Sequence, residues 1–304
     1  MIFAARNETP AFVASMTARA SPECRDTSFP VEHALSRMEE KNRRTAIGTA
    51  LVTGATKGVG KGVAVSLEHA GFRVFATGRS IEDALLPKTV IRIPCDHTND
   101  EQTDAVFDRI AAEGEGLDLL VNSAWGGYER MIENGTFTWN LPFWEQPIHR
   151  WNSMMDAGVR SAFICSARAA RMMVPQRRGL IVNISYWAAR KYIGNVIYGI
   201  SKAATDKMSV DMAHELSEHR VAVVSLYPGL VRTEAVLEAA SAGWLDISNS
   251  ESPEFIGRII AALAGDPDRM ARTGHALIAA AIAHEYGVED VDGRRPAPLT
   301  LETA

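Results

Sequence analysis

Thr53-Gly54-Ala55-Thr56-Lys57-Gly58-Val59-Gly60 follows a short β-branched run and precedes a helix-like segment. Gly54 permits a tight turn with positive φ, and Gly58 lets backbone N–H groups approach a pyrophosphate at the positive end of the helix. A Walker A loop is excluded, because five residues rather than four separate Gly54 from the Gly60-Lys61 pair and Gly62 replaces the Ser or Thr that binds Mg²⁺. We therefore expect a dinucleotide here, with Gly54, Lys57, Gly58, Val59 and Gly60 as contacts.

The chain beyond this turn alternates between strand-like and helix-like segments. Seven short, mostly apolar runs are expected to be strands, at 49–53, 73–77, 90–94, 118–122, 180–185, 221–226 and 276–281. The helix-like segments lie near 59–70, 99–113, 151–174, 198–217 and 252–264. Strands that are apolar on both faces are typical of a parallel sheet covered by helices on each side. The sequence thus predicts an α/β fold: a doubly wound, Rossmann-type parallel sheet of about seven strands, in a single domain spanning 46–304.

The composition of the 304 residues fits a soluble globular protein, with 46% hydrophobic and 23% charged residues. A net charge of −5 leaves no basic excess for a nucleic-acid backbone. Uncharged runs such as 273–284 are well short of the ~20 apolar residues that a membrane span needs. Cys24, Cys95 and Cys165 are too widely spaced for a disulfide framework or a zinc pattern. We expect no metal site and a reducing, cytoplasmic compartment.

Residues 1–45 differ from the rest, with three prolines, many Ser and Thr residues and no sustained apolar period. Their acidic residues, including Glu8, Glu23 and Asp26, argue against an organelle transit peptide. We interpret this segment as a flexible N-terminal extension, or as an upstream choice of start with Met16 and Met38 as later candidates, and assign it no chemistry.

The end of the second predicted strand indicates which dinucleotide is bound. A site for NAD normally places Asp or Glu there, to accept hydrogen bonds from the ribose 2′-hydroxyl. Here Gly78 is followed by Arg79, and Lys57 lies in the glycine-rich turn. A guanidinium and an ammonium suit a 2′-phosphate, which a carboxylate would repel. We therefore expect NADP(H) as the cofactor.

Polar residues follow the third and fourth predicted strands, at the edge where open α/β sheets bind ligands. Asp96 could accept a hydrogen bond from the adenine amino group or cap the helix that begins near residue 99, and both roles can hold together. Asn122 and Ala124, at the end of the fourth strand, are expected to line the cofactor.

The residues expected to carry chemistry are Ser185, at the end of the fifth strand, and Tyr198 and Lys202 on the following helix. At i and i+4 the last two share one helix face, so both are expected to point into the cleft. Reduction of a carbonyl by hydride transfer leaves an alkoxide that must be protonated. A tyrosine with a pKa near 10 needs a neighbouring cation for this at neutral pH. We assign Tyr198 as the acid–base, Lys202 as its support and a ribose contact, and Ser185 as the donor that orients the carbonyl.

In this order, these residues resemble the short-chain dehydrogenase/reductase family over residues 48 to about 235. The resemblance includes Tyr227-Pro228-Gly229-Leu230-Val231-Arg232-Thr233, which in that family lines the nicotinamide. It implies cofactor contacts from Pro228, Val231 and Thr233. Segments such as 143–145, 173–175 and 286–294 are similar to the dehydrogenase/reductase member 1 branch. That branch implies an NADPH-dependent carbonyl reductase of broad or lipid-like specificity.

Two positions depart from the family pattern. Trp125 stands where the family has a glycine after its fourth strand, and Gly158 stands where it has its fourth catalytic residue, an asparagine. A glycine has no side chain for a water-linked proton relay, although its carbonyl at a helix kink could still hold the water. We interpret the change as altered proton delivery rather than lost activity.

The segment 125–151 is longer than the usual connection of two to six residues. Its aromatic residues are Trp125, Tyr128, Phe137, Trp139, Phe143, Trp144 and Trp151. They could form a lid over a hydrophobic ketone or aldehyde, or only pack the insertion or a subunit contact. Trp187, two residues after Ser185, is expected to lie nearer the reacting carbonyl.

The leading hypothesis is an NADP(H)-dependent oxidoreductase acting on a small-molecule carbonyl. A nucleotide-binding regulator or scaffold with lapsed catalysis would explain the two departures, but would not need Ser185, Tyr198 and Lys202. A nucleotide-sugar epimerase or dehydratase would use the same Tyr–Lys pair, but usually has a larger carboxy-terminal substrate domain. The resemblance also implies a homodimer or homotetramer formed through 151–174 and 198–217. We expect no nucleic-acid partner and no membrane span.

Overall fold

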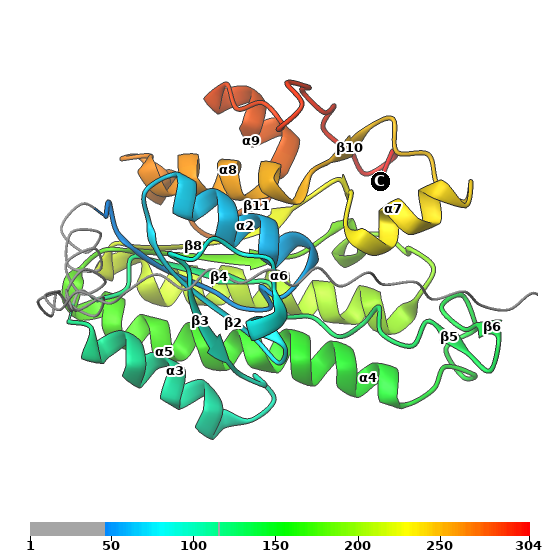
Figure 1. Cartoon of the computed structure of the whole chain (residues 1–304), viewed down its shortest axis with the longest axis horizontal. Coiled ribbons are helices and arrows are strands. Elements are labelled where there is room, and N and C mark those ends of the chain that lie inside the picture. Colours follow the sequence, from blue (N-terminus) through cyan, green and yellow to red (C-terminus); the bar gives the residue numbers. More distant parts are fainter. Residues whose placement is uncertain (1–45, 115) are drawn as a thin grey trace, which may run out of the picture. The chain divides into compact units, whose positions relative to one another are not determined.

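The computed structural model describes residues 46–114 and 116–304, so the prediction for 1–45 lies outside the described residues. Seven parallel strands form one sheet in the order β11-β8-β7-β4-β1-β2-β3 (Figure 1). They are β1 (Thr49–Val52), β2 (Arg73–Gly78), β3 (Ile91–Pro94), β4 (Leu119–Asn122), β7 (Gly179–Ile184), β8 (Val221–Tyr227) and β11 (Ala276–Ile278). The strand order reverses between β1 and β4, which confirms the doubly wound sheet of a single domain and marks where such sheets bind ligands.

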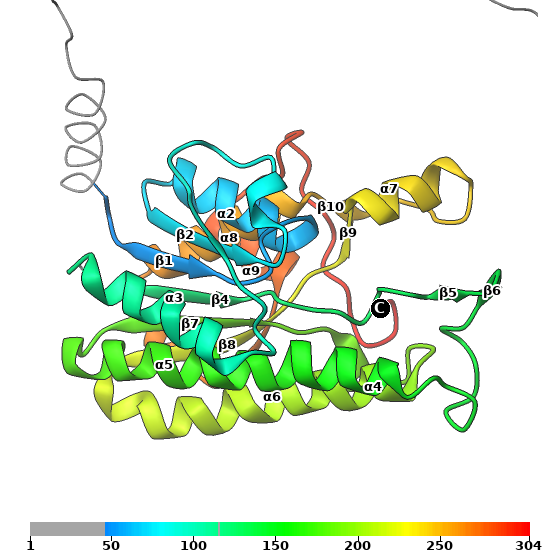
Figure 2. The ribbon, with the colours of Figure 1, turned by 60° about the horizontal axis from the view of Figure 1, so that its bottom comes forward.

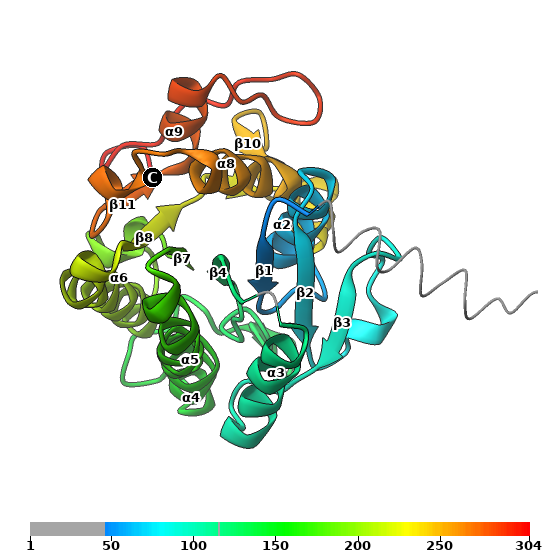
Figure 3. The ribbon, with the colours of Figure 1, turned by 90° about the vertical axis from the view of Figure 1, so that its left-hand side faces the viewer.

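Helices cover both faces of this sheet (Figure 3). Those on one face are α2 (Gly58–His69), α8 (Pro253–Gly265) and α9 (Ala279–Tyr286). Those on the other are α3 (Asp100–Ala112), α5 (Ser161–Gln176) and α6 (Val196–Leu216). Successive strand residues point to opposite faces, so Ala50 and Val52 of β1 join the first core while Leu51 joins the second. Every residue of β1, β4 and β8 is buried, as expected for strands covered on both sides.

The structure differs from the expected elements in three places. The last strand ends at Ile278, and the prediction of a strand over 279–281 is wrong because this alanine-rich run begins α9. Helix α7 (Glu234–Ser241) was not anticipated. The single helix expected over 151–174 is α4 (His149–Met154), a π-helical turn (Met155–Arg160) and α5 in succession.

The remaining elements are short. Two small ribbons are β5 (Ile132–Glu133) with β6 (Thr136–Phe137), and β9 (Leu230–Val231) with β10 (Ser250–Glu251). Single 3₁₀ turns occur at Ile81–Asp83, Trp187–Ala189, Ser217–His219 and Arg269–Arg272. The β5–β6 hairpin and α7 lie beyond the same end of the sheet (Figure 2).

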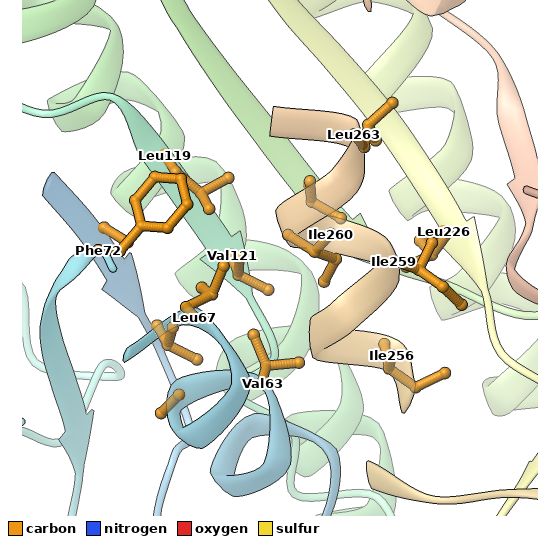
Figure 4. Packing of buried hydrophobic residues seen from close by; sticks show 14 of the residues in the cluster. Val63, Leu67, Phe72, Leu119, Val121, Leu226, Ile256, Ile259, Ile260 and Leu263 are labelled. Atoms are coloured by element: carbon orange, nitrogen blue, oxygen red, sulfur yellow. The ribbon is translucent and has the colours of Figure 1, made fainter. Parts of the chain in front are cut away.

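Helices α2 and α8 cross at very short range over the first core. Figure 4 shows their apolar side chains meeting above Leu119 and Val121 of the sheet. A Cβ atom at Gly62 would lie 2.3 Å from the carbonyl carbon of Pro253, and one at Gly257 would lie 2.6 Å from Cβ of Ser66. The close crossing therefore depends on two glycines, one from each helix.

This crossing predicts that Gly257→Ala destabilises the protein. Its new methyl group would also lie 2.8 Å from Cα of Val63, so the helices must separate. Overpacking of this kind costs about 1–3 kcal/mol, and each kcal/mol lowers Tm by about 2–4 °C in a domain of this size. Gly265→Ala is the matched control, because a Cβ at this end of the same helix meets no atom within 4 Å. Thermal melting would contradict the prediction if the two variants had the same Tm.

Candidate active site

The glycine-rich turn is held against the end of β4. Gly54 has a φ of +67°, and a Cβ atom there would lie 2.6 Å from Cα of Ala124. Oγ1 of Thr53 accepts hydrogen bonds from the backbone N–H groups of Ser123 and Ala124, each at 3.1 Å. Gly54 and Ala124, which the sequence assigned to one cofactor site, therefore lie side by side at the edge of the sheet.

The N-terminus of α2 binds a carboxylate in the structure. The backbone N–H of Gly58 donates to Oε2 of Glu234 at 3.0 Å, and Nζ of Lys61 forms an ion pair with the same carboxylate. Although partial burial acts in the opposite direction, these hydrogen bonds lower the pKa of Glu234, so that it is ionised. Lys57 precedes the helix without capping it through its side chain. The donors at this helix end thus fit an anion, as the pyrophosphate of a dinucleotide requires.

A second cation lies at the end of β2. Arg79 is exposed and forms an ion pair with Glu129, at 2.5 Å between Nη2 and Oε1. Asp96, after β3, accepts hydrogen bonds from the backbone and the hydroxyl of Thr98. Although partial burial opposes them, these bonds lower the pKa of Asp96. The residue that caps α3 is Asn99, so the interpretation of Asp96 as the cap is wrong.

The other predicted cofactor residues take different positions. The side-chain amide of Asn122 is buried and donates to Oγ of Ser166 at 2.9 Å and to Oδ1 of Asn183 at 2.7 Å. Val231 is buried in the first core, and Thr233 caps α7 next to Gly58. Among Asn122, Val231 and Thr233, it is Thr233 whose side chain lies at the glycine-rich turn. Val59 is partly buried against the first core, and Pro228 lies just before β9.

Tyr198 lies in the first turn of α6, where Asn195 caps the helix by accepting from its backbone N–H. Its ring is surrounded by those of Trp125, Tyr128, Trp139 and Tyr186, with centroids 5.4–6.3 Å away. The hydroxyl of Tyr128 donates to the hydroxyl of Tyr198 at 3.2 Å. Only 5% of Tyr198 is exposed, and this burial raises its pKa well above 10. The phenol lies beneath an aromatic cover, so the expectation that it points into an open cleft is wrong.

Lys202 follows one turn later and stays near the phenol. Its Nζ lies 5.9 Å from the ring centroid of Tyr198 and 4.1 Å from that of Trp125, and it donates to the carbonyl of Ile184 at 3.1 Å. Burial lowers the pKa of Lys202 to about 8. Oγ of Ser185 donates to the carbonyl of Lys202 at 3.4 Å. The structure thus brings the three predicted catalytic residues together, with Trp125 packed against the ammonium.

Trp125 occupies the space beside Gly158. A Cβ atom at Gly158 would lie 2.8 Å from the indole ring, so no larger residue fits there while the ring is in place. Gly158 lies within the π-helical turn, which confirms the expected irregularity, and its carbonyl accepts from Oγ of Ser161 at 3.2 Å. The two departures from the family pattern are therefore in direct contact with each other.

The aromatic insertion divides into two parts. Trp125, Tyr128 and Trp139 surround Tyr198, whereas Phe143 and Trp144 are more than half exposed. The ring of Trp187 packs against that of Tyr227 at 5.4 Å between centroids. The rings around Tyr198 therefore come largely from the insertion and not from Trp187, whose proximity to the reacting carbonyl stays a prediction.

Two carboxylates at the site were not identified from the sequence. Besides Glu234, Glu251 is buried and accepts from the backbone N–H of Gly229 at 2.7 Å, which fixes the turn after Pro228. Burial raises the pKa of Glu251 to about 7. Both contacts join residues far apart in the chain, and only the position of Glu234 directly after Thr233 could have drawn attention to it.

The described part of the chain has neither a candidate metal cluster nor a candidate membrane span. Among residues 46–114 and 116–304, no group of three His, Cys, Asp or Glu side chains could hold a metal ion. Over this described range, no helix is both long and apolar enough to cross a membrane.

The chain is similar in sequence and fold to known proteins. A family model described as short chain dehydrogenase matches residues 48–242. Dehydrogenase/reductase SDR family member 1 of Mus musculus is 37% identical over 264 residues, which cover 80% of this chain and 83% of that protein. A short-chain type dehydrogenase/reductase from Mycobacterium marinum superposes with a TM-score of 0.62 at 26% identity, covering 77% of this chain and 94% of its own.

A more distant likeness supports the fold alone. ElxO, solved with NADP bound, superposes with a TM-score of 0.64 at 23% identity, covering 76% of this chain and 96% of its own.

Since the family model spans more than half of the chain and the mouse relative aligns over most of both proteins, the chain belongs to the short-chain dehydrogenase family of oxidoreductases, in the branch of SDR family member 1.

Proposed function

We propose that the chain catalyses NADP(H)-dependent reduction of a hydrophobic ketone or aldehyde to an alcohol, or the reverse reaction. The observation that carries this proposal is the grouping of Tyr198, Lys202 and Ser185 beside Trp125, at the sheet edge that also carries the anion-binding turn. A binding protein would have no need of a buried phenol paired with a buried lysine one helical turn away.

The cofactor assignment depends on the charges at the edge of the sheet. Gly58 and Lys61, which now hold the carboxylate of Glu234, would hold the pyrophosphate, and Arg79 would hold the 2′-phosphate. A planar guanidinium binds a phosphate dianion in a bidentate manner, which favours NADP(H) over NAD(H). When bound, the dinucleotide supplies or accepts the hydride.

The protein residues would handle the proton and the oxygen. Tyr198 gives its hydroxyl proton to the carbonyl oxygen as negative charge develops there, and Lys202 lowers the free energy of the resulting phenolate. Burial disfavours both the phenolate of Tyr198 and the ammonium of Lys202. It therefore raises the pKa of Tyr198 and lowers that of Lys202 to about 8. Ser185 lies directly beyond β7 and would donate to the carbonyl oxygen once its hydroxyl leaves the Lys202 carbonyl.

The rings around Tyr198 suggest the class of substrate and a movement that admits it. Trp125, Tyr128 and Trp139 form an apolar wall, which suits a hydrophobic carbonyl compound. Because these rings cover the phenol, segment 125–130 would move on substrate entry. Gly126 and Gly127 directly follow Trp125 and would allow the backbone change that such a movement needs.

We also propose a homodimer or homotetramer in the cytoplasm. A mainly apolar groove runs between α6 and the segment formed by the π-helical turn and α5. It is lined by Met155, Val159, Phe163, Met208 and Met212, together with charged residues such as Lys207 and Asp211. Burial of such a groove against a second copy would remove apolar surface from water. Cys95 and Cys165 are both free thiols, as is usual in a reducing compartment.

Tyr198→Phe tests the proposed chemistry. We expect kcat to fall by about 10²–10⁴-fold, because the acid is removed, while the Kd for NADPH stays nearly unchanged. The measurement is NADPH oxidation with a panel of aldehydes, steroid ketones and quinones. Undiminished turnover in the variant would exclude Tyr198 as the acid, and NADPH binding without turnover of any carbonyl by the wild type would favour the regulator hypothesis.

Arg79→Ala tests the choice of cofactor. Loss of a charge-assisted hydrogen bond to phosphate costs about 1.5–3 kcal/mol, so the Kd for NADPH should rise about 10–100-fold while the Kd for NADH changes little. Arg109→Ala is the control. Arg109 lies on α3, is about as exposed as Arg79 and also forms an ion pair with a glutamate, Glu113. Equal weakening of both dinucleotides in Arg79→Ala would refute the assignment of NADP(H).

Glu234→Gln tests the pyrophosphate site. The carboxylate competes for the N–H of Gly58 and for Lys61, so removing its charge should tighten NADPH binding about three- to ten-fold. Glu238→Gln, an exposed change one turn along α7, should leave the Kd as it is. Fluorescence titration with NADPH gives both constants, and weaker binding to Glu234→Gln would show that the carboxylate supports the cofactor instead of competing with it.

A further inference from the structure

Tyr128 contributes a second hydroxyl directly at the phenol of Tyr198. The hydroxyl of Tyr128 donates to that of Tyr198 at 3.2 Å, and their ring centroids lie 6.2 Å apart. Tyr198 is buried, whereas 55% of Tyr128 is exposed. Although burial of its hydroxyl raises the pKa of Tyr128, this side chain is the exposed member of the pair and links the buried acid to the protein surface.

The side of Tyr198 that faces Lys202 is closed. The indole of Trp125 packs 4.1 Å from Nζ of Lys202, and it also fills the space next to Gly158. Nζ of Lys202 donates to the carbonyl of Ile184. The indole Nε1 is buried without a hydrogen-bond partner among the described residues. A proton reaching Tyr198 from solvent meets an apolar ring on this side.

We propose that Tyr128 returns the proton to Tyr198 after each reduction, a role that rests on the proposed function. The O–H bond of Tyr198 breaks as its proton moves to the alkoxide oxygen of the product. Once the product has left and segment 125–130 has closed over Tyr198 again, the phenolate of Tyr198 takes the proton of the Tyr128 hydroxyl. The phenolate of Tyr128 then takes one from water, leaving hydroxide that the buffer neutralises. The direction of the observed hydrogen bond, from Tyr128 to Tyr198, is the direction of this transfer.

Geometry also separates this role from simple packing. The Tyr128 ring contributes to the cover over Tyr198 together with Trp139, at 5.4 Å between centroids. A phenylalanine would keep that ring contact and lose only the hydroxyl. Tyr128→Phe thus removes the transfer and retains the cover.

The test is a stopped-flow measurement of NADPH oxidation with Tyr128→Phe at saturating carbonyl substrate. Tyr198 carries its proton before the first turnover, so the first turnover should proceed near the wild-type rate. Later turnovers should slow by about 10-fold or more, giving a burst of one NADPH per site and a larger solvent deuterium isotope effect on kcat. The Kd for NADPH and the Tm should match the wild type.

Two controls keep the outcomes distinct. Tyr192→Phe changes another tyrosine, which is 70% exposed, and should show no burst and an unchanged kcat. Tyr198→Phe should lose the first turnover as well, which tests the proposed function itself. The proposal is overturned if Tyr128→Phe keeps the wild-type kcat, or if its first turnover slows as much as its later ones, since Tyr128 would then act in packing or substrate binding.

Discussion

The indole ring of Trp125 lies between two helices, with Gly158 against one side and the ammonium of Lys202 at 4.1 Å from its ring centroid. A cation over an indole face gains about 2 kcal/mol or more when it is desolvated, which offsets part of the cost of burying Lys202. The contact requires both Trp125 and Gly158, because a side chain at position 158 would collide with the indole ring. We infer that the two departures from the family pattern are one compensated change.

At the expected cofactor site, carboxylates of the chain itself pair with the groups that could bind phosphate. The amide of Gly58 and the ammonium of Lys61 hold Glu234, and Arg79 holds Glu129. The amides at a helix N-terminus have no partner within the helix and lie at its positive end, so a carboxylate from a neighbouring segment binds there. The exposed pair of Arg79 and Glu129 contributes little to stability. Each of these contacts is one that a phosphate can replace, because a phosphate offers the same donors a larger charge.

Local patterns predicted most of the fold and the grouping of the proposed chemical residues. All seven strands were expected, since apolar runs on both faces are a local property, and Tyr198 and Lys202 share a helix face by spacing alone. The missed features depend on distance in the chain. Glu234 meets Gly58 across 176 positions, and Tyr128 meets Tyr198 across 70. No periodicity or motif reports such a contact, which only the packed domain creates.

Tyr128 and Glu129 are consecutive residues, so one short loop holds the acid at one end of the site and Arg79 at the other. If a phosphate binds Arg79 in place of Glu129, the ion pair breaks, and Glu129, the residue next to Tyr128, loses this contact. Burial of Tyr198 makes its phenolate costly, and a second hydroxyl at 3.2 Å shortens the time for which that charge must exist. If Tyr128 returns the proton as we propose, the aromatic cover and the proton supply both come from one loop, in which Trp125 fills the space beside Gly158 and Tyr128 contacts Tyr198.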